Sequence, residues 1–259
     1  FGELLKRAQE LNADALATGH YAKVAKEKDG LYALYMARDK AKDQSYFLYH
    51  LNQEKLKHIL LPMGNLMKTE VYALARRFKL PRVFEKKESQ GVCFFAEKTP
   101  ENFLKRHLAA HFFKSGSILT VNGKIIGEHK GLPLYTIGQR RGLGIGGLKD
   151  EKDGGGWYVV NIDVKKNQVI VGRKEDAFRK SFTCDKMSFI APLSGAVKMK
   201  LAVRVRYRAK TVPATLEIKH ANGFVKCNSP VFAISPGQSA VFYDGEKVLG
   251  GGIICNDGA

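Results

Sequence analysis

The stretch Ala15-Leu16-Ala17-Thr18-Gly19-His20-Tyr21 decides how the first part of the chain folds. Its apolar run predicts a short buried strand that ends at the Gly-His pair. Residues 1–11 and 68–79 carry apolar side chains at helical spacing, and residues 31–36 predict a further strand. Alternating helices and strands indicate an α/β layer with a parallel sheet. Ligands bind such sheets at the carboxyl ends of strands, where the Gly-His pair falls.

The sequence changes character from about residue 115. Residues 117–126 predict a β-hairpin with a type I′ turn at Asn122-Gly123, and residues 136–156 are rich in glycine. After about residue 180 only short alternating runs and turns such as Asn222-Gly223 remain, which is typical of a small antiparallel barrel or sandwich. We predict three domains, at residues 1–104, 105–178 and 179–259.

The chain is strongly basic. Its 259 residues contain 43 Lys and Arg against 25 Asp and Glu, a formal net charge of +18, and each predicted domain contributes to the excess. This distribution favours a polyanionic partner, nucleic acid before a membrane, because no basic amphipathic helix is evident. A generally basic protein without an RNA partner is the alternative at this point. No apolar run approaches the roughly 20 residues that span a bilayer.

The four cysteines are Cys93, Cys184, Cys227 and Cys255, and no two have the C-x-x-C spacing of a metal site. They are too few for a disulfide scaffold, which predicts a reducing, cytoplasmic compartment. The last three lie in strand-like contexts and are expected to be small buried hydrophobes. Cys93 follows a polar, glycine-containing segment, where it is either a buried strand residue or a nucleophile.

Two polar patterns are candidates for binding. Lys42-Asp43-Gln44 precedes an apolar run, which predicts the start of a helix with Asp43 as its N-cap. Capping leaves Lys42 for a phosphate and Gln44 for a nucleobase edge. A second pattern alternates cations with apolar residues and would place four cations on one strand face, where they bind phosphate or are merely solvated. These cations are Arg204, Arg206, Arg208 and Lys210.

The glycine-rich stretch 142–147 invites a dinucleotide-binding interpretation. No helical pattern follows it, and the chain has no Gly-Lys-Ser/Thr motif. Gln139, Arg140 and Arg141 instead predict a basic loop that faces RNA.

Seven stretches, in their order along the chain, resemble the tRNA-specific 2-thiouridylases, which place sulfur on the wobble uridine of certain tRNAs. They are ATGHY (17–21), KDQSYFL (42–48), ESQGVCF (88–94), YTIGQRRGLGIGG (135–147), RVRYR (204–208), SPGQSAVFY (235–243) and LGGGII (249–254). The resemblance implies that residues 1–104 are the C-terminal part of a PP-loop ATP-pyrophosphatase domain. A central tRNA-binding domain and a C-terminal β-barrel would follow it.

The resemblance also implies roles for particular residues. Cys93 would carry sulfur as a persulfide, and Gly19 would place its backbone against ATP. The residues that would contact tRNA are His20, Lys42, Asp43, Gln44, Arg206, Tyr207 and Gln238. Glu88 and Gln90 stand where the family has Asp and Thr, which we interpret as tolerated variation.

The implied reaction begins when ATP, with Mg²⁺, adenylates the C2 oxygen of uridine 34. Sulfur from the persulfide then displaces AMP, directly or after a second cysteine forms a transient disulfide with Cys93. The implied partners are tRNA and a sulfur-donor protein, a cysteine desulfurase or a sulfur-relay protein, with no membrane and no metal site. The protein would be a monomer.

The family's nucleotide-binding Ser-Gly-Gly-x-Asp-Ser loop and first catalytic cysteine precede the position of Phe1, and this sequence contains neither. We therefore expect the chain as given to lack ATP-pyrophosphatase activity. Two alternatives stay open: a non-catalytic RNA-binding module, and a PP-loop synthetase that adenylates a small molecule.

Overall fold

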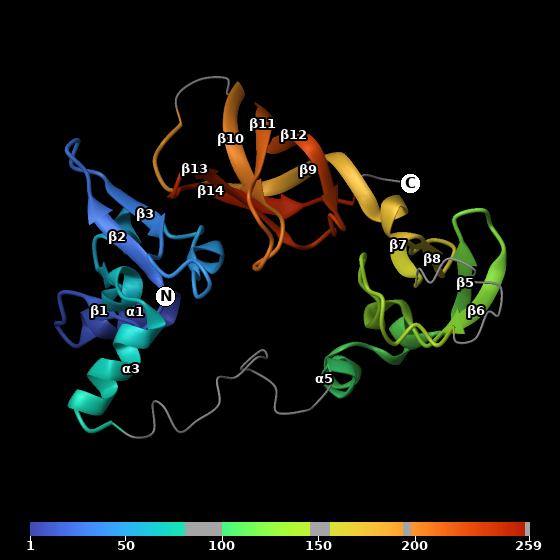
Figure 1. Ribbon diagram of the computed structural model, residues 1–259, viewed down its shortest axis with the longest axis horizontal. Coiled ribbons are helices and arrows are strands. Elements are labelled where there is room, and N and C mark those ends of the chain that lie inside the picture. The colour runs from blue at the N-terminus through green and yellow to red at the C-terminus, as the bar shows by residue number, and fades with distance from the viewer. Residues whose placement is uncertain (81–99, 146–155, 194–197, 257–259) are drawn as a thin grey trace. The chain divides into compact units, whose positions relative to one another are not determined.

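The computed structural model describes residues 1–80, 100–145, 156–193 and 198–256 (Figure 1). The chain divides into two compact units. The first combines residues 1–87, 181–229 and 236–255, and the second combines residues 88–180, 230–235 and 256–259. The N-terminal segment and most of the C-terminal strands therefore share one unit, although they are far apart in sequence.

The N-terminal segment has the predicted α/β character. Strand β1 (Leu16–Ala17) pairs in parallel with β4 (Ile59–Leu60). The α-helices in the described residues of this segment are α1 (Gly2–Glu10), α2 (Gln53–Leu56) and α3 (Lys68–Arg77). The helices predicted at 1–11 and 68–79 are thus confirmed. The strand predicted at the opening stretch is also present, but Leu16 is only half-buried and Ala17 is exposed.

An antiparallel hairpin lies between the two parallel strands in the sequence. It consists of β2 (Ala22–Lys26) and β3 (Tyr32–Met36), joined by residues 27–31 with Gly30 at a φ of 85°. This connection is too short for the crossover that parallel strands need. Strand β3 also pairs with β14 (Lys247–Ile254). The strand predicted at 31–36 therefore exists, but it extends the sheet of the C-terminal strands rather than a parallel layer.

The C-terminal strands form a closed barrel. They are β9 (Phe178–Phe189), β10 (Lys198–Arg204), β11 (Val212–Lys219), β12 (Asn222–Phe232), β13 (Ser239–Asp244) and β14. Their order is β13-β10-β11-β12-β9-β14, and a further β13–β14 pairing closes the ring. The predicted barrel is confirmed. The β11–β12 turn falls at residues 220–221 rather than at Asn222-Gly223, because Lys219 pairs directly with Asn222.

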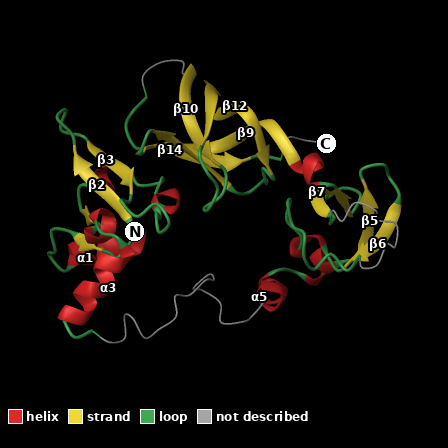
Figure 2. Cartoon of the chain, viewed as in Figure 1, coloured by secondary structure: helices red, strands yellow, loops and turns green. Residues whose placement is uncertain are grey.

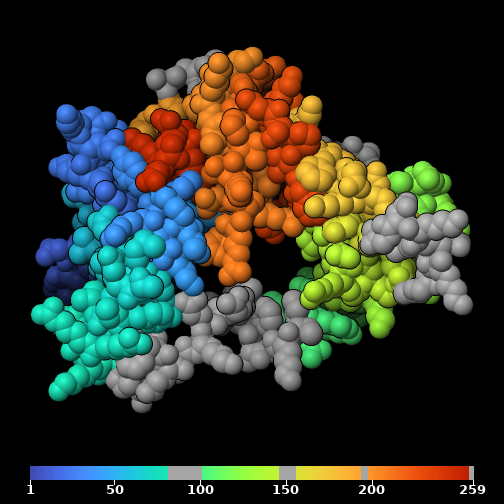
Figure 3. Space-filling model, in the orientation of Figure 1, coloured from blue at the N-terminus to red at the C-terminus, as the bar shows by residue number. Residues whose placement is uncertain are grey.

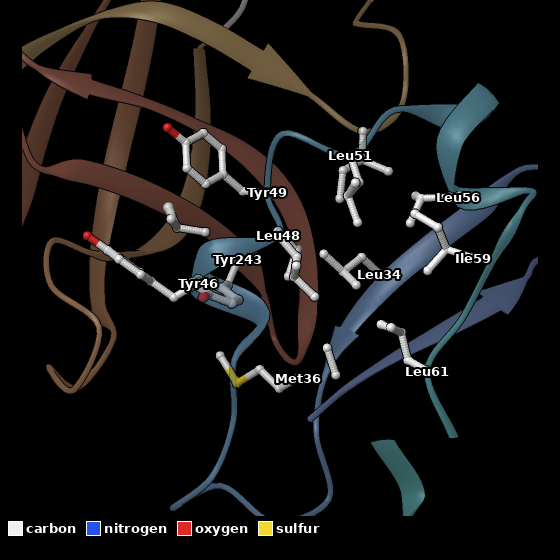
Figure 4. Packing of buried hydrophobic residues seen from close by; sticks show 14 residues of the cluster. Leu34, Met36, Tyr46, Leu48, Tyr49, Leu51, Leu56, Ile59, Leu61 and Tyr243 are labelled. Carbon is white, nitrogen blue, oxygen red and sulfur yellow. The ribbon is translucent and has the colours of Figure 1, made fainter. Parts of the chain in front are cut away.

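Buried side chains join the N-terminal segment to the barrel within the first unit (Figure 4). The 3₁₀ turn η1 (Ser45–Phe47) replaces the longer helix expected at this point and leads an apolar run into the cluster. Members of the cluster from this run, β3, α2 and β13 include Leu34, Tyr46, Leu48, Tyr49, Leu51, Leu56 and Tyr243. The KDQSYFL stretch is thus anchored by its apolar half, which fixes where its polar half lies.

The second unit is built on a four-stranded sheet (Figure 2). Its strands are β5 (Gly116–Thr120), β6 (Ile125–His129), β7 (Tyr158–Asp163) and β8 (Gln168–Gly172), in the order β6-β5-β8-β7. Helix α5 (Pro100–His107) and the 3₁₀ turns η3 (Ala110–Phe113), η4 (Leu132–Leu134) and η5 (Lys174–Ala177) complete it. The hairpin predicted at 117–126 is confirmed. Its turn is not type I′, since Gly123 has a positive φ and Asn122 does not.

Candidate nucleic-acid interface

Two hydrogen bonds join the segment after β1 to the segment that opens the η1 turn. The Tyr21 amide donates to Oε1 of Gln44 at 2.9 Å, and the Gln44 amide donates to the Tyr21 carbonyl at 2.7 Å. The two residues lie 23 positions apart in sequence. The structure therefore brings the ATGHY stretch and the Lys42-Asp43-Gln44 stretch to one place on the first unit.

Gly19 and His20 lie at the carboxyl end of β1. A side-chain carbon built on Gly19 would have no atom within 4 Å, so a ligand can approach its backbone. His20 is half-buried, and its Nδ1 lies 2.9 Å from Oγ1 of Thr18. Burial lowers the pKa of His20, so the ring is neutral at pH 7 and offers hydrogen bonds rather than a charge.

Asp43 is the most enclosed of the predicted site residues that the structure describes, since its side chain is 1% exposed. Oδ1 accepts hydrogen bonds from the amides of Ala37 at 3.0 Å and Ser45 at 3.3 Å. Oδ2 accepts one from the Ser45 hydroxyl and one from Arg204 Nη1, both at 2.9 Å. The prediction that Asp43 is a helix N-cap is wrong, because Gln44 precedes the η1 turn as its cap residue and no side chain caps the turn. The bond from the Ser45 amide, two residues further on, is instead a local Asx-type turn contact. The tRNA contact implied for Asp43 stays a prediction, and the structure gives the carboxylate protein partners instead.

Arg204 is the last residue of β10, and its side chain is 12% exposed. Besides the ion pair with Asp43, its guanidinium lies 5.1 Å from the centre of the Tyr243 ring, and Nη2 lies 3.8 Å from the Met36 sulfur. The expectation of four cations on one strand face is wrong here. The strand ends at Arg204, and the next residues form a turn closed by a hydrogen bond from the Ala209 amide to the Arg206 carbonyl at 3.1 Å.

The turn at residues 205–209 carries two of the predicted tRNA contacts. Burial lowers the pKa of Arg206, which lies near Tyr46. The ring of Tyr207 packs 4.5 Å from the ring of Phe47, which is 55% exposed. The guanidinium of Arg208 lies 5.9 Å from the centre of the Tyr207 ring. The cations of this turn thus lie beside the exposed ring of Phe47 and the partly buried ring of Tyr207, a composition that favours single-stranded nucleic acid.

A pocket of about 250 Å³ lies between this turn and the segment before η1. Its lining residues are Lys40, Ala41, Asp43, Arg204, Tyr207, Arg208 and Ala209. Asp43 pairs with Arg204, and Lys40 pairs with Glu246 outside the lining, so the net positive charge of the lining comes from Arg208. In the space-filling view, the light blue segment around residues 40–50 lies against the orange barrel strands (Figure 3).

Gln238 is exposed at the turn between β12 and β13. The turn is fixed by Gly237, which has a φ of 81° and donates to the Ile254 carbonyl at 2.9 Å. The carbonyl of the neighbouring Ser239 accepts a hydrogen bond from the Tyr46 hydroxyl at 2.8 Å. The Ser239 hydroxyl lies 3.1 Å from the Tyr49 hydroxyl. The SPGQ turn is therefore attached to the same apolar run that follows Gln44.

Cys93 lies at 81–99, outside the described residues, so its implied role stays a prediction. The three described cysteines are free thiols. Cys184 and Cys227 are buried as expected, but Cys255 is only half-buried, so the expectation is wrong for that residue. Burial raises the pKa of the Cys227 thiol to about 11, which makes it unreactive. Within the described part of the chain no group of three or more His, Cys, Asp or Glu could hold a metal ion. In the same residues no helix is long and apolar enough to cross a membrane.

Sequence reasoning missed two features of this site. It placed Arg204 on an exposed face, whereas the structure buries it against Asp43, 161 positions away in sequence. It also did not single out Phe47, whose exposure beside Tyr207 depends on how the η1 turn meets the barrel. An Asp followed by a polar residue and an apolar run signals capping, but no local signal identifies the distant partner.

Family models match three consecutive parts of the chain. A tRNA methyl transferase HUP domain matches residues 1–97, a tRNA methyl transferase PRC-barrel domain matches residues 101–173, and an aminomethyltransferase beta-barrel domain matches residues 179–254. The fold and these matches define a multidomain protein of the tRNA-modifying class.

Curated relatives give the family. A tRNA-specific 2-thiouridylase MnmA of Clostridium acetobutylicum is 40% identical over 98% of this chain and 69% of its own length. An MnmA 2 of Thermoanaerobacter sp. is 44% identical over 98% of the chain and 68% of its own length, and an MnmA of Stutzerimonas stutzeri is 42% identical over 98% and 67%. The chain belongs to the family of tRNA-specific 2-thiouridylases.

Proposed function

We propose that the protein takes part in 2-thiolation of the wobble uridine, position 34, of tRNA, and that its first unit binds the tRNA. One observation carries the proposal. The segments with the implied tRNA contacts, around His20, Gln44, Tyr207 and Gln238, are held together by hydrogen bonds and packing although they come from opposite ends of the sequence.

The charge of this surface supports an RNA partner. The pocket lining is positive, and Lys42, Arg206 and Lys210 add cations near it in the sequence. Sequence-specific RNA recognition mostly uses unstacked bases that lie on aromatic rings or guanidinium groups. Phe47 and Tyr207 supply the rings and Arg208 supplies the guanidinium. An anticodon loop, which holds position 34, is a single-stranded ligand of this kind.

We propose, from the family resemblance, that Cys93 carries the sulfur as a persulfide. ATP activates the uridine by forming a bond between its α-phosphorus and the C2 oxygen, with loss of pyrophosphate. The terminal sulfur of the Cys93 persulfide attacks C2, and AMP leaves with the oxygen. A second thiol then attacks Cys93 Sγ, breaks the persulfide bond and forms a disulfide, and the electron pair stays with sulfur on C2. A reductant that restores both thiols completes the cycle.

The ATP would lie against Gly19. No atom lies within 4 Å of the position that a side-chain carbon on Gly19 would take, which leaves its backbone at the end of β1 open to a ligand, and Mg²⁺ would arrive bound to the phosphates. A sulfur-donor protein, a cysteine desulfurase or a sulfur-relay protein, would load Cys93. We propose a monomer that works in the cytoplasm, where thiols are kept reduced.

Binding of an unmodified tRNA substrate, measured over a range of salt concentrations, tests the first part of the proposal. We expect the affinity to fall linearly on a double-logarithmic plot, by about 0.7–0.9 per phosphate contact, because binding releases counterions. An affinity that does not change with salt would favour the small-molecule synthetase. Tight, salt-dependent binding together with no thiolation by the full-length protein would favour the non-catalytic RNA-binding module.

A further inference from the structure

We propose that Asp43 and Arg204 form a positioning pair, whose ion pair holds the two walls of the pocket together. The inference rests on the proposed function, because it concerns how the same surface is set for tRNA. One wall is lined by Lys40, Ala41 and Asp43, and the other by Arg204, Tyr207, Arg208 and Ala209. The implied tRNA contacts Lys42 and Gln44 are sequence neighbours of Asp43, and Arg206 is a neighbour of Tyr207.

Both oxygens of the Asp43 carboxylate accept hydrogen bonds from other groups of the protein. Two amides, one hydroxyl and one guanidinium bond to its two oxygens, and 1% of the side chain is exposed. An exposed carboxylate at this place would repel phosphates. Its burial against a cation removes that repulsion and fixes the backbone of residues 37–45, which carries Lys42 and Gln44.

The guanidinium of Arg204 is also fixed by several contacts. Asp43, the ring of Tyr243 and the sulfur of Met36 contact its guanidinium, and the side chain is 12% exposed. The residue ends β10 and directly precedes the turn that carries Arg206 and Tyr207. The direction in which this turn leaves the barrel therefore depends on where the guanidinium is anchored.

Among the described residues of the first unit, this pair is more buried than the other ion pairs. Lys40 pairs with Glu246 at 2.6 Å with side chains 48% and 63% exposed, and Lys198 pairs with Glu217 at 2.6 Å with side chains 70% and 35% exposed. Exposed pairs contribute little, whereas a buried pair that loses one partner leaves an uncompensated charge. The geometry of the pocket is thus sensitive to Asp43 and Arg204 in a way that it is not to the exposed pairs.

A double-mutant cycle with Asp43→Asn and Arg204→Met tests the inference. Asparagine keeps a side-chain oxygen for the Ser45 amide, and methionine keeps much of the buried apolar stem. Each single variant should weaken tRNA binding at least tenfold at fixed salt. The double variant should bind no more weakly than the worse single variant, and its salt slope should equal that of the parent, because no phosphate contact is removed. Glu217→Gln, which breaks an exposed ion pair, is the matched control and should change neither the tRNA affinity nor its salt slope.

Two results would overturn the inference. One is unchanged affinity in both folded single variants. The other is a loss in the double variant that equals the product of the single losses with a shallower salt slope, which would mean that Arg204 contacts a phosphate itself. If a single variant does not fold, the salt slope of the double variant decides. Absence of salt-dependent binding by the parent would instead contradict the proposed function.

Discussion

Gln44 and Tyr21 exchange two hydrogen bonds: the Tyr21 amide donates to the side-chain oxygen of Gln44, and the Gln44 amide donates to the Tyr21 carbonyl. The exchange joins the end of β1, where the nucleotide is proposed to lie, to the stretch that is proposed to meet the target uridine. Adenylation needs the ATP α-phosphorus and the uridine C2 oxygen in contact, so a fixed distance between these two segments is a requirement of the chemistry.

Two substitutions of Gln44 distinguish its structural role, as acceptor for the Tyr21 amide, from its proposed role in tRNA binding. Gln44→Ala leaves the Tyr21 amide without its acceptor, so we expect a loss of about 1–3 kcal/mol in the free energy of unfolding. Gln44→Glu keeps an acceptor oxygen and should lose less stability, but it adds an anion and should weaken tRNA binding. Urea denaturation and tRNA titration of both variants check this. Equal stability losses in the two variants would contradict the structural role.

Phe47 should matter for RNA more than for folding. Its side chain is 55% exposed and lies on Tyr207, so Phe47→Ala should cost less than about 1 kcal/mol of stability. If a base stacks on this aromatic pair, the free energy of tRNA binding should weaken by about 1–3 kcal/mol, a loss of affinity of roughly 5- to 150-fold. Phe224→Ala removes another partly exposed barrel aromatic, 44% exposed, as the control. A similar loss for both variants would speak against a specific platform.

The stability of the first unit should decrease as the pH falls from 7 to 5. Burial lowers the pKa of His20, and of His50 in the same direction, so the unfolded chain binds more protons than the folded protein in this range. The stabilisation is complete above the unfolded pKa near 6.5 and is lost as the pH falls toward the folded pKa. His20→Asn should reduce the pH dependence of urea midpoints between pH 7 and 5. An unchanged dependence would show that His20 is not buried as described.

The described cysteines should differ in their reaction with iodoacetamide. Cys255 is half-exposed, whereas Cys184 and Cys227 are buried and the pKa of Cys227 is raised to about 11. In the native protein Cys255 should therefore react faster than the other two, as peptide mass spectrometry would show. A double Cys184→Ala, Cys227→Ala variant of the full-length protein should keep thiolation. Loss of thiolation at unchanged stability would give one of these thiols a chemical role.

The sequence predicts the helices and strands of this protein better than it predicts which of them pair or pack together. Apolar periodicity finds α3, β3 and the barrel strands, because those patterns are local. It cannot show that β3 pairs with β14, since strand pairing depends on residues some two hundred positions away. The same holds for the site. Local chemistry identifies Gln44 and Asp43, but the burial of Asp43 depends on Arg204, which strand periodicity assigns to an exposed face.

The central claim is that Cys93 carries the sulfur to a tRNA held by the first unit. Thiolation of uridine 34 by the full-length Cys93→Ser variant, measured by mass spectrometry of digested tRNA beside tRNA affinity, tests it most directly. We expect thiolation to be abolished while tRNA affinity stays within about threefold of the parent, because one side-chain atom changes and no proposed tRNA contact is lost. Full thiolation by the variant would contradict the account.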